Sequence, residues 1–363
     1  MSQKQGNIVL RVSNNSSIIF MSDSEIKAFA KDMMATLQKY KQTSNSKAIW
    51  QICNSMIPFV AIWVAMYWAF SYNLFLFFGL GIVNAFFLVR IFIIQHDCGH
   101  HSFVKSKKWR NAIGFVCSIF SAMPYEYWAD AHAFHHNHNG KLETRDIGDI
   151  NTLTVKEYQE MSTWERLKYQ IFRFPIVTFM IGPIIYFVRN MRLPLVVLDN
   201  NKSRAVWSVM INNIVVIGGL IALCLVFDWK AILATYCTVL YLFSIIAIWF
   251  FFVQHQHEDG YKRWENNWDH FVSAVKGSTY YKLPGLVNWL TGNIGVHHIH
   301  HLYAAIPNYN LVKCIKENPE FSKYTTVVTF WESLKYMNHK LWDEDAQRMI
   351  TFGEYKKLYK VAA

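Results

Sequence analysis

Charged side chains are scarce in this sequence. Of its 363 residues, 17% are Asp, Glu, Lys or Arg, against about 25% in typical soluble domains. Hydrophobic residues make up 53% and aromatic residues 17%, and amphipathic rings are enriched where a chain meets the boundary between lipid and water. The composition argues against an ordinary soluble protein and indicates an integral membrane protein.

Closely spaced cysteines are also missing. The six cysteines are scattered, form no CxxC pair and partly lie inside apolar runs, which argues against a disulfide framework and against a thiolate metal site. The first residues, MSQKQGNIVLRVSNN, lack the apolar core of a signal peptide. We therefore expect the first spanning helix to direct membrane insertion.

A concentrated basic stripe is absent, although the net charge is +11, from 36 Lys plus Arg and 25 Asp plus Glu. The positive charge lies in the stretches between apolar runs, as in cytoplasmic segments beside anionic lipid. This distribution argues against nucleic acid as a partner.

Four apolar segments are long enough to cross a membrane: residues 50–70, 74–95, 205–227 and 231–253. Each supplies the roughly 20 residues that a span needs at 1.5 Å per residue. Loops of three residues join them into two hairpins, and these loops hold one lysine, Lys230. The positive-inside rule then predicts that both termini and all remaining segments are cytoplasmic.

Two other apolar stretches fit a span less well. Residues 111–124 are too short, and residues 170–188 contain Pro175 and Pro183. Because proline frees backbone groups that need partners in lipid, we expect an interfacial or shallowly re-entrant helix at 170–188 rather than a true span.

The N-terminal segment contains a predicted amphipathic helix. Ser22 and Glu25 have the spacing of a capping box. The apolar face that follows can pack on the protein itself or lie on the membrane surface; its members are Ile26, Phe29, Ala30, Met33 and Leu37.

Histidines are concentrated in four patches, which hold 14 of the 15 in the chain. The patches are HDCGHH (96–101), HAFHHNH (132–138), QHQHE (254–258) with His270 shortly after, and NIGVHHIHHL (293–302). With four spans, all of them lie beyond the same membrane face.

The spacing within these patches predicts metal ligands. His96 and His100 are four residues apart, and the pattern HxxHH occurs twice, at residues 132–136 and 297–301. On a helix, positions i, i+3 and i+4 share a face, so each HxxHH can give three nitrogens to one centre. The nine candidate ligands are His96, His100, His132, His135, His136, His255, His297, His300 and His301.

Nine ligands exceed any single zinc site and suit two metal ions, and imidazole ligation favours Zn, Cu, Fe or Ni over Mg or Ca. The alternative is a pH-sensing or structural use of the histidines. A haem protein or metal transporter would carry histidines or acids within its spans, and these four spans have none. Six further residues are candidates for orienting the ligands: Asp97, His101, Asp146, His257, Glu258 and His298.

These patterns resemble the membrane-bound fatty acid desaturases, a family with histidine boxes HxxxH, HxxHH and HxxHH around a di-iron centre. The similarity extends over nearly the whole chain and is closest to bacterial acyl-lipid enzymes of delta-5 and delta-12 (omega-6) type. It rests on RIFIIQHDCGHHSF (90–103), RDIGDI (145–150), FFVQHQHED (252–259), GSTYYKLP (277–284) and GNIGVHHIHHLYAAIPNYNL (292–311). At His257 we would expect an aromatic residue instead.

The resemblance implies an all-α integral membrane protein with four transmembrane helices as two hairpins and a cytoplasmic helical cap that holds the di-iron site. It assigns the nine histidines to two iron ions. The implied activity is an O2-dependent oxidoreductase that introduces a cis double bond into the acyl chain of a lipid. Such chemistry needs a metal, since an unactivated methylene has neither an acidic proton nor a leaving group. The alternative is a related di-iron lipid hydroxylase or a carotenoid ketolase or hydroxylase.

The electron donor is expected to be a separate carrier of ferredoxin, flavodoxin or cytochrome b5 type, because no HPGG haem motif is visible. The oligomeric state is left open. The predicted organisation is a cytoplasmic N-terminal segment (1–49), a first hairpin (50–95), a region with the first two histidine boxes (96–204), a second hairpin (205–253) and a region with the third box (254–363).

Overall fold

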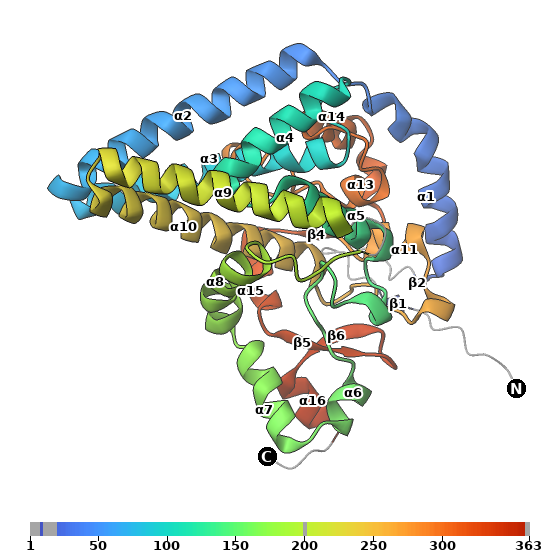
Figure 1. The fold of residues 1–363 in the computed structure, drawn as a ribbon. Coiled ribbons are helices and arrows are strands. Elements are labelled where there is room, and N and C mark those ends of the chain that lie inside the picture. Colours follow the sequence, from blue (N-terminus) through green and yellow to red (C-terminus); the bar gives the residue numbers. More distant parts are fainter. Residues whose placement is uncertain (1–7, 10–19, 199–201, 360–363) are drawn as a thin grey trace, which may run out of the picture.

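The computed structural model describes residues 8–9, 20–198 and 202–359. Among these residues, four helices are long and apolar enough to cross a membrane. They are α2 (Asn45–Tyr72), α3 (Leu74–Gly99), α9 (Lys202–Val226) and α10 (Trp229–His255), and they form the elongated upper part of the molecule in Figure 1. The four predicted spans are confirmed as helices, and each helix extends beyond the predicted segment by a few residues at one or both ends.

The two tight connections are built from capping side chains. Asn73 alone separates α2 from α3: its backbone N–H donates to the carbonyl of Ala69, and its side-chain oxygen accepts from the N–H of Leu76 at 3.0 Å. Asp228 caps α10 by accepting from the N–H of Lys230 at 2.9 Å. Each cap satisfies a donor that a helix start would otherwise leave without a partner.

Helix α3 is the most enclosed of the four. In its most apolar stretch 56% of the residues are buried, against 22% in α2 and 17% in α9. It packs against α2, α10 and α4 (Lys107–Ser121). The exposed apolar faces of α2 and α9 are therefore available to lipid.

Shorter helices gather at one end of the long ones (Figure 1). Helix α1 (Asp23–Leu37) starts with the predicted capping box of Ser22 and Glu25 and packs against α11 (His270–Lys276). Its apolar face is used inside the protein, because four of the five predicted positions are buried. Further short helices are η1 (Gln38–Tyr40), α5 (Tyr125–His138), η6 (Glu265–Asn267), α13 (His297–Leu302), α14 (Asn308–Glu317) and η7 (Pro319–Ser322).

A smaller lobe extends below the long helices in Figure 1. It has its own apolar core, in which Leu153 and Tyr169 pack with Leu341 and Ile350. Arg173, almost fully buried, donates to the side chain of Gln256 and to the backbone of His339, both at 3.2 Å. The lobe comprises η2 (Leu142–Thr144), α6 (Val155–Glu160), α7 (Thr163–Phe172), β5 (His339–Asp343), β6 (Arg348–Thr351) and α16 (Phe352–Leu358).

The proline-containing stretch is a bent helix. Helix α7 is followed by η3 (Val177–Ile181), α8 (Gly182–Ile185) and η4 (Tyr186–Asn190), and the chain turns by 60° at the break between Phe172 and Val177. By length and apolarity this pair is either a broken span or a re-entrant segment. Pro175 lies in the break, where its missing N–H costs no helical bond.

Strands are few and short. Strands β1 (Ile8–Val9) and β2 (Phe20–Met21) are antiparallel, as are β5 and β6, and β3 (Thr279–Tyr281) pairs in parallel with β4 (Thr326–Val328). Helix α12 (Gly285–Leu290) lies after β3, and α15 (Phe330–Tyr336) lies after β4. Gly292 and Asn293 have φ of 58° and 60°, so a left-handed turn separates α12 from the last histidine box.

Candidate metal centre

The nine predicted ligands come together at the end of the long helices. His96 lies in the last turn of α3 and His100 at its C-cap, and His255 is the final residue of α10. The other six are on α5 and α13. Helices far apart in the sequence therefore supply one buried region, in which His100 and His132 are the two ligands of intermediate exposure.

Five of these histidines form the first group, called here the five-histidine group: His96, His100, His132, His136 and His300. One ring nitrogen from each lies within 4.8 Å of one from every other member. Nε2 of His136 lies 3.1 Å from Nε2 of His132 and 3.1 Å from Nε2 of His300. The lone pairs of imidazoles from three separate segments thus converge on one small volume.

The remaining four form the second group, the four-histidine group. His135, His255 and His301 have ring nitrogens within 4.8 Å of one another. His297 joins them, since its Nε2 lies 2.9 Å from Nε2 of His255 and 3.0 Å from Nε2 of His301. Nε2 of His135 lies 3.2 Å from Nε2 of His255.

Each HxxHH box is divided between the two groups, so its three histidines do not all face the same group. On α5, His132 and His136 belong to the five-histidine group and His135 to the other. On α13 the division is reversed, because His300 alone faces the five-histidine group. Both helices lie between the groups. On each helix, the two histidines that are four residues apart point toward one group, and the remaining histidine points toward the other.

Burial favours the neutral form of the candidate ligands on α5 and α13 and of His100. Desolvation holds the pKa of His100, His136 and His300 well below the usual value, and neighbouring histidines lower it further. Burial lowers the pKa of His135 to about 4, although the nearby Asp149 carboxylate acts in the opposite direction. A neutral imidazole has a free lone pair, which is the form that binds a metal.

Two of the nine ligands have a fixed tautomer. Nδ1 of His96 lies 2.9 Å from Oδ1 of Asp97, and Nδ1 of His255 lies 3.1 Å from the carbonyl oxygen of Gly277. Each Nδ1–H donates to oxygen, which leaves the Nε2 lone pair of that ring facing its group. In addition, the indole of Trp128 stacks on His132 at 4.4 Å between ring centroids and 19° between planes.

The donor set fits two transition-metal ions. Nε2 atoms that face one another at 2.9 to 3.2 Å cannot all be satisfied by hydrogen bonds, because a neutral imidazole carries a single N–H. Nε2 of His100 is buried without a partner among the described residues. Metal binding would engage these lone pairs, and imidazole nitrogens are typical ligands of iron, zinc, copper and nickel.

Comparison with known proteins identifies the family. The profile of the family described as fatty acid desaturase matches residues 73–333. A fatty acid desaturase of Bacillus subtilis is 34% identical over 342 residues, which cover 93% of this chain and 95% of that protein. The chain belongs to the fatty acid desaturase family.

More distant relatives of this desaturase carry more specific names. An sn-1 acyl-lipid omega-3 desaturase (ferredoxin) of Nostoc sp. is 27% identical over 260 residues, which cover 67% of this chain and 68% of that protein. A chloroplastic omega-3 fatty acid desaturase of Glycine max is 26% identical over 253 residues, which cover 64% of this chain and 52% of that protein. The predicted family is confirmed, and the chain is a multi-pass membrane oxidoreductase that desaturates acyl chains. The delta-5 or delta-12 branch stays a prediction.

Of the six residues predicted to orient the metal ligands, Asp97 contacts one of the nine candidate histidines, His96. Asp146 is exposed and accepts from the amide of Asn151 at 2.6 Å, and the exposed Glu258 pairs with Arg348 at 3.1 Å. His101 is also exposed and lies outside both groups.

His257 and His298 are fully or almost fully buried but belong to neither group. Burial lowers the pKa of each to about 3. The ring of His257 lies 6.3 Å from that of Tyr336, and the ring of His298 lies 5.7 Å from that of Tyr280. Each of these two histidines therefore has an aromatic ring nearby and lies outside both groups of predicted ligands.

Sequence reasoning missed Asn308. This residue, 1% exposed, donates to Oδ2 of Asp97 from its backbone N–H at 2.6 Å and from its side-chain amide at 2.8 Å. The two bonds hold the carboxylate that in turn orients His96. Asn308 lies in the IPNYNL part of the motif that carried the resemblance, but a motif match does not reveal a contact with a residue 211 positions away.

Proposed function

We propose that this desaturase introduces a cis double bond into an acyl chain of a membrane lipid, with O2 as oxidant and two electrons from a separate carrier protein. The acyl chain loses two hydrogen atoms, and one O2 accepts these together with two electrons and two protons to form two water molecules. The observation that carries the proposal is the convergence of nine imidazoles in two adjacent groups.

Two iron ions held by the nine histidines would supply the redox chemistry, which no side chain of the protein provides. The protein's own contribution is to hold the ligands and to exclude water. His96 and His255 are oriented through Nδ1, by Asp97 and by the Gly277 carbonyl. The groups are buried at the ends of α3 and α10, next to the hydrocarbon region from which an acyl chain would arrive.

We propose that the histidine groups face the cytoplasm. The turns at the far ends of the long helices carry one lysine, Lys230, and the positive-inside rule assigns the more basic side to the cytoplasm. An electron carrier of ferredoxin, flavodoxin or cytochrome b5 type would reach the site from that side. The name of the Nostoc relative includes ferredoxin, which supports the first of these.

The bent segment from α7 to η4 is proposed to be re-entrant or interfacial rather than a fifth span. At its entry, Arg173 contacts Gln256, the residue after the ligand His255. After its exit, Val196 donates to the hydroxyl of Tyr127 on α5 at 3.2 Å. Both contacts are at the histidine end of the long helices, so the chain returns to the side from which it left.

Expression in a host that lacks the product tests the proposal. Fatty acid methyl esters from aerobic cells should include a species lighter than its precursor by two hydrogens, and anaerobic cells should lack it. A product heavier by one oxygen would identify a hydroxylase. Iron analysis of the purified protein should give two ions per chain, and a protein with two irons that yields no modified lipid under any donor would contradict the proposal.

A further inference from the structure

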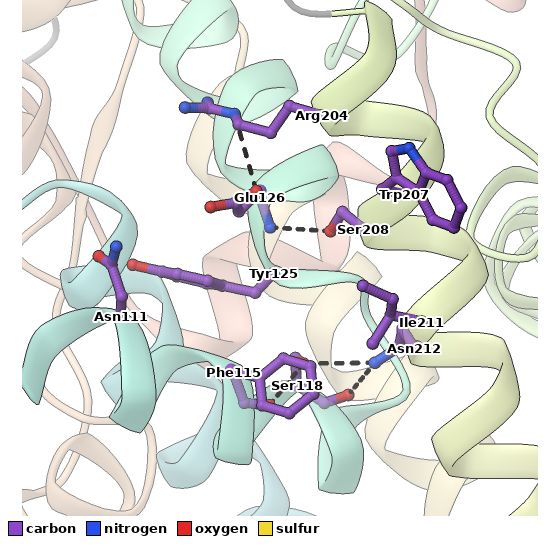
Figure 2. A pocket seen from close by; sticks show the side chains of 10 residues that line it. All are labelled: Asn111, Phe115, Ser118, Tyr125, Glu126, Arg204, Trp207, Ser208, Ile211 and Asn212. Atoms are coloured by element: carbon purple, nitrogen blue, oxygen red, sulfur yellow. Dashed lines mark hydrogen bonds and ion pairs between the residues drawn. The ribbon is translucent and has the colours of Figure 1, made fainter. Parts of the chain in front are cut away.

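A crevice of about 320 Å³ lies between α4, α5 and α9, apart from the histidine groups. Figure 2 shows its lining, with the α9 side chains on one side and those of α4 and the start of α5 on the other. Its lining includes Phe115, Glu126, Arg204, Trp207, Ser208 and Ile211.

The floor of this crevice is apolar and continuous with the lipid-facing side of α9. Trp207 is 63% exposed and Ile211 43%, and Ile214 extends the same face with 66%. Phe115, 38% exposed, faces them from α4. Exposed apolar positions that line a hollow on a spanning helix suit a hydrocarbon chain.

The rim of the crevice carries charges of both signs. The guanidinium of Arg204 bonds to Asp130 and lies 3.8 Å from the carboxylate of Glu126. The side chains of Arg204 and Glu126 are 47% and 40% exposed. The rim therefore offers one cation and one weakly engaged carboxylate to a ligand from the bilayer.

The rim is held rigidly against α5. The hydroxyl of Ser208 on α9 accepts from the backbone N–H of Glu126 at 3.1 Å (Figure 2) and from that of Tyr127 at 3.3 Å, and so caps the start of α5. On the other side, Asn212 donates to the backbone and hydroxyl of Ser118 on α4 at 3.0 and 3.2 Å. Two polar contacts thus fix the three helices that form the walls.

Position in the fold puts the rim at the depth of lipid headgroups. Arg204 stands in the first turn of the spanning helix α9. Glu126 lies six residues before His132 on α5, or about 9 Å along the helix axis at 1.5 Å per residue. The crevice opens to lipid on the same side of the membrane as the histidine groups.

We propose that this crevice binds a phospholipid whose headgroup carries both a phosphate and an ammonium group, such as phosphatidylethanolamine. Arg204 contacts the phosphate, Glu126 contacts the ammonium, and one acyl chain lies along Phe115, Trp207 and Ile211. Because Asp130 already neutralises much of the arginine charge, a purely anionic headgroup is bound less well.

Native mass spectrometry of the delipidated full-length protein, with phosphatidylethanolamine or phosphatidylglycerol added back, tests the site. The wild type should retain phosphatidylethanolamine at least fivefold better. Glu126→Gln should remove this preference, and Arg204→Gln should reduce retention of phosphatidylethanolamine about tenfold. Ile211→Trp, which fills the floor, should reduce retention of both lipids. Arg189→Gln is the matched control, since Arg189 is an exposed arginine of the bent segment outside the crevice.

Iron content is measured alongside, so that lost folding is distinguished from a lost lipid site. Equal retention of both lipids by the wild type, or retention unchanged in Arg204→Gln and Ile211→Trp, would overturn the proposal. The result does not depend on desaturation, because lipid retention is measured without substrate turnover.

Discussion

The two histidine groups share α5 and α13 but differ in number and in support. The five-histidine group takes two residues from α5 and one from α13, and the four-histidine group takes one and two. The first also includes the two ligands of intermediate exposure, whereas all members of the second are buried. Two metal ions bound by these groups would therefore differ in their access to solvent.

The groups also differ in what orients them. In the five-histidine group a carboxylate, Asp97, holds His96, and Asn308 holds that carboxylate. In the four-histidine group a backbone carbonyl, that of Gly277, holds His255. A carboxylate raises the basicity of a ligand more than a neutral carbonyl does. The difference indicates that a side-chain substitution can change the orientation and basicity of His96 in the five-histidine group. The orientation of His255 in the four-histidine group depends instead on the path of the backbone.

The largest effect is expected from removing one ligand of each group. His300→Ala removes a nitrogen from the five-histidine group, and His297→Ala removes one from the four-histidine group. Each variant should abolish the unsaturated product and lower the amount of bound iron, because no neighbouring side chain replaces the lost nitrogen. The protein should still insert in the membrane. His298→Leu is the matched control: it is buried in the same helix, lies outside both groups and keeps a similar volume. Product from either alanine variant at wild-type level would refute the assignment of that ligand.

A smaller effect is expected from the orienting contacts. Asp97→Asn keeps the size of the side chain but removes its charge, and should weaken iron binding about 10- to 100-fold. Gly277→Ala should disturb the other group, since its Cβ would stand 2.6 Å from the carbonyl oxygen of Ser273 and 2.9 Å from Nδ2 of Asn139. The loop must shift, and the carbonyl that holds His255 shifts with it.

For both variants, the iron content per chain is measured over a series of chelator concentrations. In each variant, the iron of the altered group should be lost at a lower chelator concentration than the iron of the other group. Loss of both ions together in Asp97→Asn would show that the groups act as one site and would remove the distinction between them.

The sequence was sufficient to predict the spans and the histidines that the fold brings together. Long apolar runs report on the membrane directly, and histidines at i, i+3 and i+4 are rare enough to stand out. It could not predict how α5 and α13 divide their histidines. Periodicity indicates which residues share a helix face, but which neighbour each one meets depends on how the helices pack.

Contacts between segments far apart in the sequence could not be predicted either. Leu283, Leu286, Val287, Leu290 and Ile294 have helical spacing, yet helix α12 stops at Leu290. The left-handed turn at Gly292 brings its backbone against Ile93, where a Cβ would stand 2.7 Å away. Close packing against α3 thus overrides the local pattern, as it also brings Asn308 to Asp97.

The smallest effect is expected from Asp146→Asn and Glu258→Gln. Both carboxylates are exposed and engage other partners, Asn151 and Arg348, so each substitution should change the free energy of unfolding by at most about 1 kcal/mol. Iron content and product should match the wild type, in contrast to Asp97→Asn. Reduced iron in either variant would mean that its carboxylate turns toward a histidine group when metal binds. The contrast between one carboxylate-supported group and one carbonyl-supported group would then have to be abandoned, because a second acid would support the ligands.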